Sequence, residues 1–169
     1  MSGDPVPAIA EAEATGEVAA LYADIRATLG VPVVNLIWRH LAIFPGALPW
    51  AWGSLKPLYA DDSIAAQAAA LRAELEMPTL AGLSAPTLAS AGLHPDDLSR
   101  IAMILHSYER SNAMNMVALC ALSARLNGDT PTAGDMAAPL PMEAPISGKM
   151  PALLTLDAMA PAVRGLVED

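Results

Sequence analysis

The sequence predicts an all-α fold, and three observations support this prediction. Of the 169 residues, 54% are hydrophobic but only 4% are aromatic, and alanine, the best helix former, is abundant. Apolar residues recur at spacings of three and four, as they do on the buried face of a helix. Strand-like alternation of useful length is missing from the sequence. The length suits one domain with a sizeable core.

The N-terminal half predicts four helices. Residues 1–13 form an acidic lead that we expect to be mobile. Thr15 can cap a first helix over 16–29, which Gly30 ends. A second helix follows Pro32; it is apolar nearly all round and is therefore expected to be central and largely buried. The third helix, over 46–58, begins after Pro45 and contains two tryptophans. The fourth runs from Asp61 or Asp62 to about residue 76.

The C-terminal half predicts one short helix, one long helix and a tail. A short helical turn is expected near 85–91, and a long helix over 95–126. Pro95 suits the first helical position, and Asn127-Gly128 suits the end. Residues 129–169 are rich in proline, which predicts an extended tail on the surface with a short helix near 152–159.

Two asparagines interrupt an apolar seam on the long helix. The seam has alternating spacings of three and four and consists of Leu98, Ile101, Leu105, Tyr108, Asn112, Asn115, Leu119, Leu122 and Leu126. A buried amide costs free energy unless it is hydrogen-bonded. Asn112 and Asn115 therefore either form a small polar site or pair with another helix and fix its register. Two further polar residues, Arg39 and His40, lie on the apolar second helix, and Arg39 suits either an ion pair or anion binding.

Composition excludes several classes of function. Eighteen acidic and nine basic residues give a net charge of −9, which disfavours binding to nucleic acid and to anionic membranes. The three histidines have no spacing typical of metal ligands, and the single cysteine, Cys120, excludes a disulfide within the chain. The N-terminal residues lack a basic and then apolar signal, so we expect a cytoplasmic protein.

Two runs of the sequence resemble a known family. The first run is EATGEVAALYADIRATLGVPVVNLIWRHLAIFPGALPWAW, and it contains the elements DIR-x-TL-x-VP and R-x-LA-x-FPG-x-L-x-x-AW. The second run is LASAGLHPDDLSRIAMILHSYERSNAMNMVALCALSARL, and it contains a Ser-Asn step at its centre. In order and spacing these elements resemble the first repeat of the group I, or D,L-type, 2-haloacid dehalogenases. The resemblance covers about residues 14–126.

The resemblance implies a fold and a reaction. The fold would be an all-α domain over 14–128, equivalent to one repeat of a two-repeat dehalogenase and distantly similar to alkylhydroperoxidase D. The reaction would be the hydrolytic removal of halide from the α-carbon of a small 2-halocarboxylic acid of either configuration. In the family an aspartate activates a water molecule that attacks directly, without a metal or an organic cofactor.

Two departures from the family pattern matter. The chain is only about one repeat long, so a homodimer would have to replace the two-repeat body. The family's aspartate belongs to the second repeat, and superposing the repeats places Ile37 at its position. The asparagine that helps to hold the water falls on Asn112. Glu109, one turn earlier, is then the candidate substitute base, with a surface or ion-paired role as its alternative.

These matches define a candidate site and two hypotheses. Asn112 and Glu109 would be catalytic, and the substrate-binding residues would be Val33, Leu36, Ile37, Arg39 and Asn115, with Arg39 holding the carboxylate. The first hypothesis is a metal-independent hydrolase without a cofactor. The alternative is a non-catalytic dimeric helical module that has lost the aspartate.

Overall fold

The chain forms a helical bundle built along one long helix. The computed structural model describes residues 6–60, 62–76, 78, 82, 84–90, 92–129, 144–150, 156–161 and 164. Over these residues every regular element is a helix, which confirms the predicted fold class. The elements are α1 (Gly16–Leu29), α2 (Leu36–Leu41), α3 (Ala47–Ala60), α4 (Ser63–Glu74), α5 (Ala85–Ser90), α6 (Pro95–Leu126) and the short 3₁₀ helix η1 (Leu156–Ala158).

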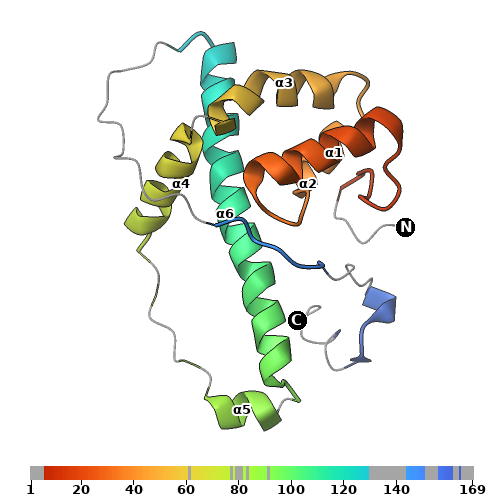
Figure 1. The fold of residues 1–169 in the computed structure, drawn as a ribbon, viewed down its shortest axis with the longest axis vertical. Coiled ribbons are helices and arrows are strands. Elements are labelled where there is room, and N and C mark those ends of the chain that lie inside the picture. The colour runs from red at the N-terminus through yellow and green to blue at the C-terminus, as the bar shows by residue number, and fades with distance from the viewer. Residues whose placement is uncertain are drawn as a thin grey trace.

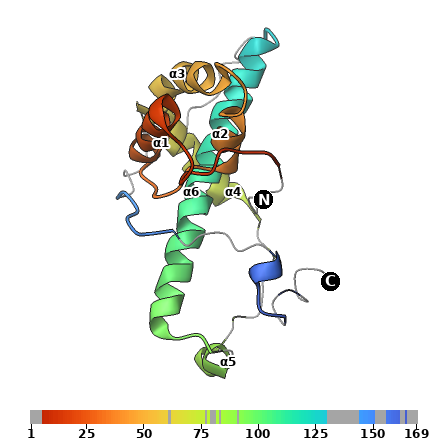
Figure 2. The same cartoon turned by 90° about the vertical axis from the view of Figure 1, so that its right-hand side faces the viewer.

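Helices α1 to α4 surround the C-terminal half of α6, whereas its N-terminal half extends away from them toward α5 (Figures 1 and 2). The core lies where these helices meet. Tyr22, Ile25 and Leu29 of α1 are almost fully buried there. Trp52 packs edge-on against Trp38, with ring centroids 5.4 Å apart. Burial of these large side chains is the main contribution to the stability of the bundle.

Helix α2 is shorter and more peripheral than the sequence suggested. It ends at Leu41, and only Trp38 within it is buried. Ile37 retains 37% of its surface exposed. The amides of Ile43 and Phe44 bond to carbonyls three residues back, so the chain leaves the helix through a tight turn before Pro45. Helical backbone angles are disfavoured for Phe44 because it precedes Pro45, and α2 therefore ends before this residue, at Leu41.

The buried face of α6 is rotated away from the apolar seam. Its buried residues are Ser107, Arg110, Ser111, Met114, Asn115 and Ala118. Of the seam, Leu105 and Leu126 are each 65% exposed. Small side chains in the middle of α6 allow the other helices to approach closely. The seam and the buried face overlap at Asn115, and Tyr108, Leu119 and Leu122 are partly buried against the core. Hydrophobic periodicity therefore identified the helix but not the centre of its buried face.

Part of the N-terminal lead makes defined contacts. The Tyr22 hydroxyl donates to the Ile9 carbonyl at 3.0 Å. The Glu11 carboxylate accepts a hydrogen bond from the Val34 amide at 2.8 Å and pairs with Arg26. Mobility of residues 1–13 stays a prediction, and residues 1–5 lie outside the described residues.

Residues 144–150 run in an extended conformation across α6 (Figure 1). The Ile146 amide donates to the Gly30 carbonyl at 2.9 Å, and Arg110 Nη1 donates to the Ala144 carbonyl at 3.1 Å. Only part of the predicted C-terminal tail is described, and the expected helix near 152–159 appears there as η1 alone. Residues 152–155 lie outside the described residues.

Gly30 is the position at which backbone conformation and close packing coincide. It ends α1 with φ at +64°, and a Cβ there would lie 3.2 Å from Arg110 Nη2. We expect Gly30→Ala to lower the free energy of unfolding by about 1–2 kcal/mol, because a left-handed conformation disfavours a Cβ. Urea denaturation followed by tryptophan fluorescence measures the change.

Gly53→Ala is the matched control. Gly53 lies within α3, and a Cβ there meets nothing within 4 Å. This variant should be stabilised by about 0.5–1 kcal/mol, because alanine loses less backbone entropy in a helix. A Gly30→Ala protein as stable as the wild type would contradict the role assigned to this glycine.

Candidate functional site

A polar cluster lies where the start of α2 meets the middle of α6. Asn35 precedes α2, and its side chain makes no capping bond to that helix. Instead, its Nδ2 donates to Ser111 Oγ at 2.9 Å and to Asn112 Oδ1 at 2.7 Å. Asn35 is 3% exposed, whereas Asn112 is exposed. The cluster thus links a buried amide to one at the surface.

Asn115 joins α6 to two other helices. Its Oδ1 accepts a hydrogen bond from Trp38 Nε1 at 3.2 Å and another from the Tyr59 hydroxyl at 3.0 Å. Burial raises the pKa of the Tyr59 phenol, so the hydroxyl stays protonated and remains a donor. Of the two interpretations of the seam asparagines, pairing with another helix therefore applies to Asn115 through its Oδ1. Its predicted role in substrate binding stays a prediction.

Two buried amide atoms have no hydrogen-bond partner among the described residues. They are Asn35 Oδ1 and Asn115 Nδ2. A buried polar atom without a partner costs free energy, and such atoms are uncommon in folded proteins. They concentrate here on the two asparagines that anchor the polar cluster.

The other predicted site residues differ in exposure. Glu109 is exposed on α6, one turn before Asn112. Arg39 is half-buried, and its Nε donates to the Val34 carbonyl at 3.0 Å. Val33 is buried, and Leu36 is half-buried. With Ile37 also exposed, a single chain presents Glu109, Asn112 and Ile37 on its surface.

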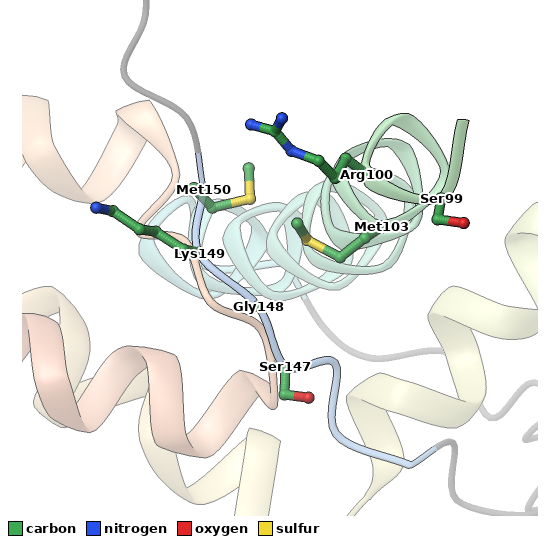
Figure 3. A pocket seen from close by; sticks show the side chains of 7 residues that line it. All are labelled: Ser99, Arg100, Met103, Ser147, Gly148, Lys149 and Met150. Carbon is green, nitrogen blue, oxygen red and sulfur yellow. The ribbon is translucent and has the colours of Figure 1, made fainter. Parts of the chain in front are cut away.

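A separate open cavity of about 690 Å³ lies between the N-terminal half of α6 and residues 147–150 (Figure 3). It is lined by Ser99, Arg100, Met103, Ser147, Gly148, Lys149 and Met150. None of the predicted site residues lines it. It has cations but no carboxylate, so it offers no base for hydrolysis.

The described residues form neither a metal-binding group nor a membrane-spanning helix. Within the ranges given above, no three His, Cys, Asp or Glu residues are grouped so that they could hold a metal ion. In the same part of the chain, no helix is long and apolar enough to cross a membrane.

Sequence reasoning missed Asn35, Ser111 and Tyr59. Asn35 stands where a helix cap is expected, so its amide had an ordinary local explanation. Ser111 is a small polar residue outside the apolar seam. A signal was nevertheless present, since an asparagine needs partners when it is buried in an apolar helix.

Comparison with known proteins gives consistent relatives. The chain is 30% identical over 172 residues to a configuration-inverting 2-haloacid dehalogenase of Alcaligenes xylosoxydans xylosoxydans, an alignment that covers 96% of the chain and 57% of the relative. It is also 30% identical over 112 residues to an (R)-2-haloacid dehalogenase of Pseudomonas putida, covering 63% and 37%. No family model matches the chain.

A solved structure shares the fold. A D-2-haloacid dehalogenase mutant in complex with D-2-CPA superposes with a TM-score of 0.61 and 18% identity, over 98% of this chain and 60% of that one. The chain therefore spans little more than half the length of the relatives that match most of it.

The hydrogen bonds of Asn115 give a test of the cluster. Asn115→Ala should lower the free energy of unfolding by at least about 2 kcal/mol, because two buried donors, on Trp38 and Tyr59, lose their acceptor. Tyr59→Phe removes one donor together with its bond and should cost only about 1 kcal/mol. Urea denaturation measures both.

The double variant tests whether these two residues act through their shared bond. Its cost should be smaller than the sum of the single costs, because Tyr59→Phe leaves one fewer donor to be stranded by Asn115→Ala. Additive costs would show that the hydrogen bond contributes nothing.

Proposed function

This chain belongs to the group I 2-haloacid dehalogenase family, and we propose that it hydrolyses a small 2-halocarboxylic acid in a site completed by a second copy of the chain. The observation that carries the proposal is the placement of Asn112. It is the family's water-holding asparagine by resemblance, and its amide is held by Asn35 on the exposed side of α6.

The proposed reaction is a direct displacement by water. The water oxygen forms a bond to the α-carbon, the carbon–halogen bond breaks, and the halide leaves with the bonding electrons. A base accepts one water proton, and the product is the 2-hydroxy acid. Attack from the side opposite the halide inverts the configuration, and one relative is named for configuration inversion.

The base is the critical assignment. In a homodimer, Ile37 occupies the family's aspartate position in both copies, and an alkyl side chain accepts no proton. Glu109 is the carboxylate one helical turn from Asn112 on the same exposed side of α6. We assign it the role of base. Arg39, a half-buried cation of α2, is assigned to the substrate carboxylate.

The exposed face of α6 supports a second copy as the missing half. Leu105 and Met116 are 65% and 59% exposed and flank Asn112 along the helix. Large apolar side chains gathered along one face are typical of an interface. A second copy packed on this face would shield Glu109 and Asn112 from bulk solvent, which strengthens electrostatic interactions in the site.

A second candidate function has one observation in its favour. Ile37 stands where the family's aspartate would be, and Glu109 is exposed in the single chain. A non-catalytic dimeric helical module is consistent with both facts. The two candidates differ in whether any halide is released.

Halide release from separate (R)- and (S)-2-chloropropionate tests the activity. The wild type should release halide slowly, and Glu109→Gln should reduce the rate by about 10²-fold or more, because general-base help is typically worth that much. Glu17→Gln, at an exposed carboxylate of α1, is the matched control and should leave the rate unchanged.

Ile37→Asp is the complementary variant. It should raise the rate by restoring a carboxylate at the family position, and adding Asn112→Ala should abolish the gain. Ile43→Asp, at a side chain 36% exposed, controls for an added surface charge. If none of these folded proteins releases halide from either enantiomer, the chain is the non-catalytic module.

Light scattering tests the homodimer. The wild type should have the mass of two chains at micromolar concentration, and Leu105→Glu should shift the mass toward one chain, because a buried charge would oppose the interface. Leu75→Glu, at a leucine 56% exposed beyond the end of α4, should leave the dimer intact. A monomeric wild type would overturn the proposed assembly.

A further inference from the structure

We infer that Asn35 is a positioning residue that fixes the orientation of the Asn112 amide, so that Asn112 presents its NH₂ group to the site and acts there only as a hydrogen-bond donor. The orientation follows from contacts within one chain. Only its catalytic consequence rests on the proposed function.

The orientation originates in the backbone of α6. Ser111 Oγ donates its hydrogen to the Ser107 carbonyl at 2.7 Å. A serine hydroxyl has one hydrogen, so Ser111 Oγ can only accept a hydrogen bond from its other neighbour. That neighbour is the Asn35 amide at 2.9 Å. Asn35 must therefore turn its NH₂ group, and not its oxygen, toward Ser111.

The same NH₂ group then sets the polarity of Asn112. Its two hydrogens serve Ser111 Oγ and Asn112 Oδ1, the second at 2.7 Å. Because this group only donates, Asn112 must turn its oxygen toward it. The Asn112 NH₂ is the other end of the same planar amide and points away from Asn35, and the residue is exposed.

Hydrogen-bond counting excludes the reversed arrangement. With both amides flipped, Asn112 would donate to Asn35, but the Ser111 hydrogen could serve either Asn35 or the Ser107 carbonyl, not both. The observed arrangement makes three hydrogen bonds and the flipped one makes two. Asn35 and Ser111 are both buried, so water does not replace the lost bond readily.

The consequence concerns which groups Asn112 can hold. An NH₂ group binds an electron pair: the oxygen of a water molecule, a carboxylate or a departing halide. It accepts no proton. A water held in this way keeps both of its hydrogens free for a base and one electron pair free for the α-carbon. Asn112 therefore positions the water but leaves deprotonation entirely to another group.

Side-chain amide hydrogen exchange, followed by ¹⁵N NMR on the full chain, tests the orientation without any substrate. In the wild type the Asn35 NH₂ should exchange more slowly than the Asn112 NH₂ by about tenfold or more, because the first is buried and bonded and the second is not. Slow exchange at Asn112 together with fast exchange at Asn35 would overturn the inference.

Two variants and one control sharpen the test. Asn35→Asp presents only acceptors, so the Asn112 amide should flip and its NH₂ should become protected. Ser111→Ala removes the group that fixes Asn35, and protection of the Asn35 NH₂ from exchange should fall by about tenfold.

Ser107→Ala is the matched control. Ser107 is as buried as Ser111, and its hydroxyl donates to the Met103 carbonyl. The alanine variant keeps the backbone carbonyl of residue 107, to which Ser111 donates. Both exchange rates should match the wild type. Because Ser111→Ala adds no charge, it keeps the test decisive if Asn35→Asp fails to fold.

Halide release separates this inference from the proposed function. If the chain is active, Ser111→Ala should lower kcat by about tenfold or more with a smaller change in KM, because a misplaced group costs rate more than binding. Ser107→Ala should leave both unchanged. If no protein in this set releases halide, the proposed function is refuted but the orientation of Asn112 is not. If amide exchange is unchanged in Ser111→Ala and in folded Asn35→Asp, the orientation is refuted even when the protein is active.

Discussion

Close packing against the middle of α6 is the physical constraint that shapes the contacts around it. Ser107, Ser111 and Ala118 have no exposed surface, and their small size lets neighbouring segments pack against the helix. That approach removes water from every polar group at the contact. Buried polar groups are stabilised by protein partners, and Asn35 Nδ2 and Asn115 Oδ1 have such partners here, whereas Asn35 Oδ1 and Asn115 Nδ2 have none among the described residues. The close packing on α6 and the buried hydrogen bonds at this contact therefore have the same cause.

The same constraint explains how much the sequence could predict. Both helices have the expected bounds, and Gly30, Pro95 and Asn127-Gly128 are the local signals at their ends. The expected cap at Thr15 is wrong in one respect, because its side chain makes no capping hydrogen bond. The buried face of α6 does not follow, because hydrophobic periodicity gives weight to large apolar residues. Leu105 satisfies that pattern and is exposed, while Ser111 violates it and is buried. Which face is buried depends on the shape of the partner, and a single sequence does not describe the partner.

The candidate site was predictable in its type but not in its connections. Asn112 stood out as an amide in an apolar seam, and the family resemblance gave it a role. Its partner Asn35 lies 77 residues away in sequence, at a position with an ordinary local explanation. Asn115, on the same seam, is instead bonded to Trp38 and Tyr59. Asn112 and Asn115 occupy the same seam in the sequence pattern but differ in environment. Asn112 is exposed, and Asn115 faces the core.

The extended segment over 144–150 bears on how the chain folds. Its two anchors, at Gly30 and Arg110, are far from it in sequence, and both exist only after α1 and α6 have been placed. The segment cannot dock before the elements that hold its anchors, and its extended backbone has no helical hydrogen bonds of its own to favour order. This segment should therefore dock last on the folding pathway and be among the first parts of the native protein to open.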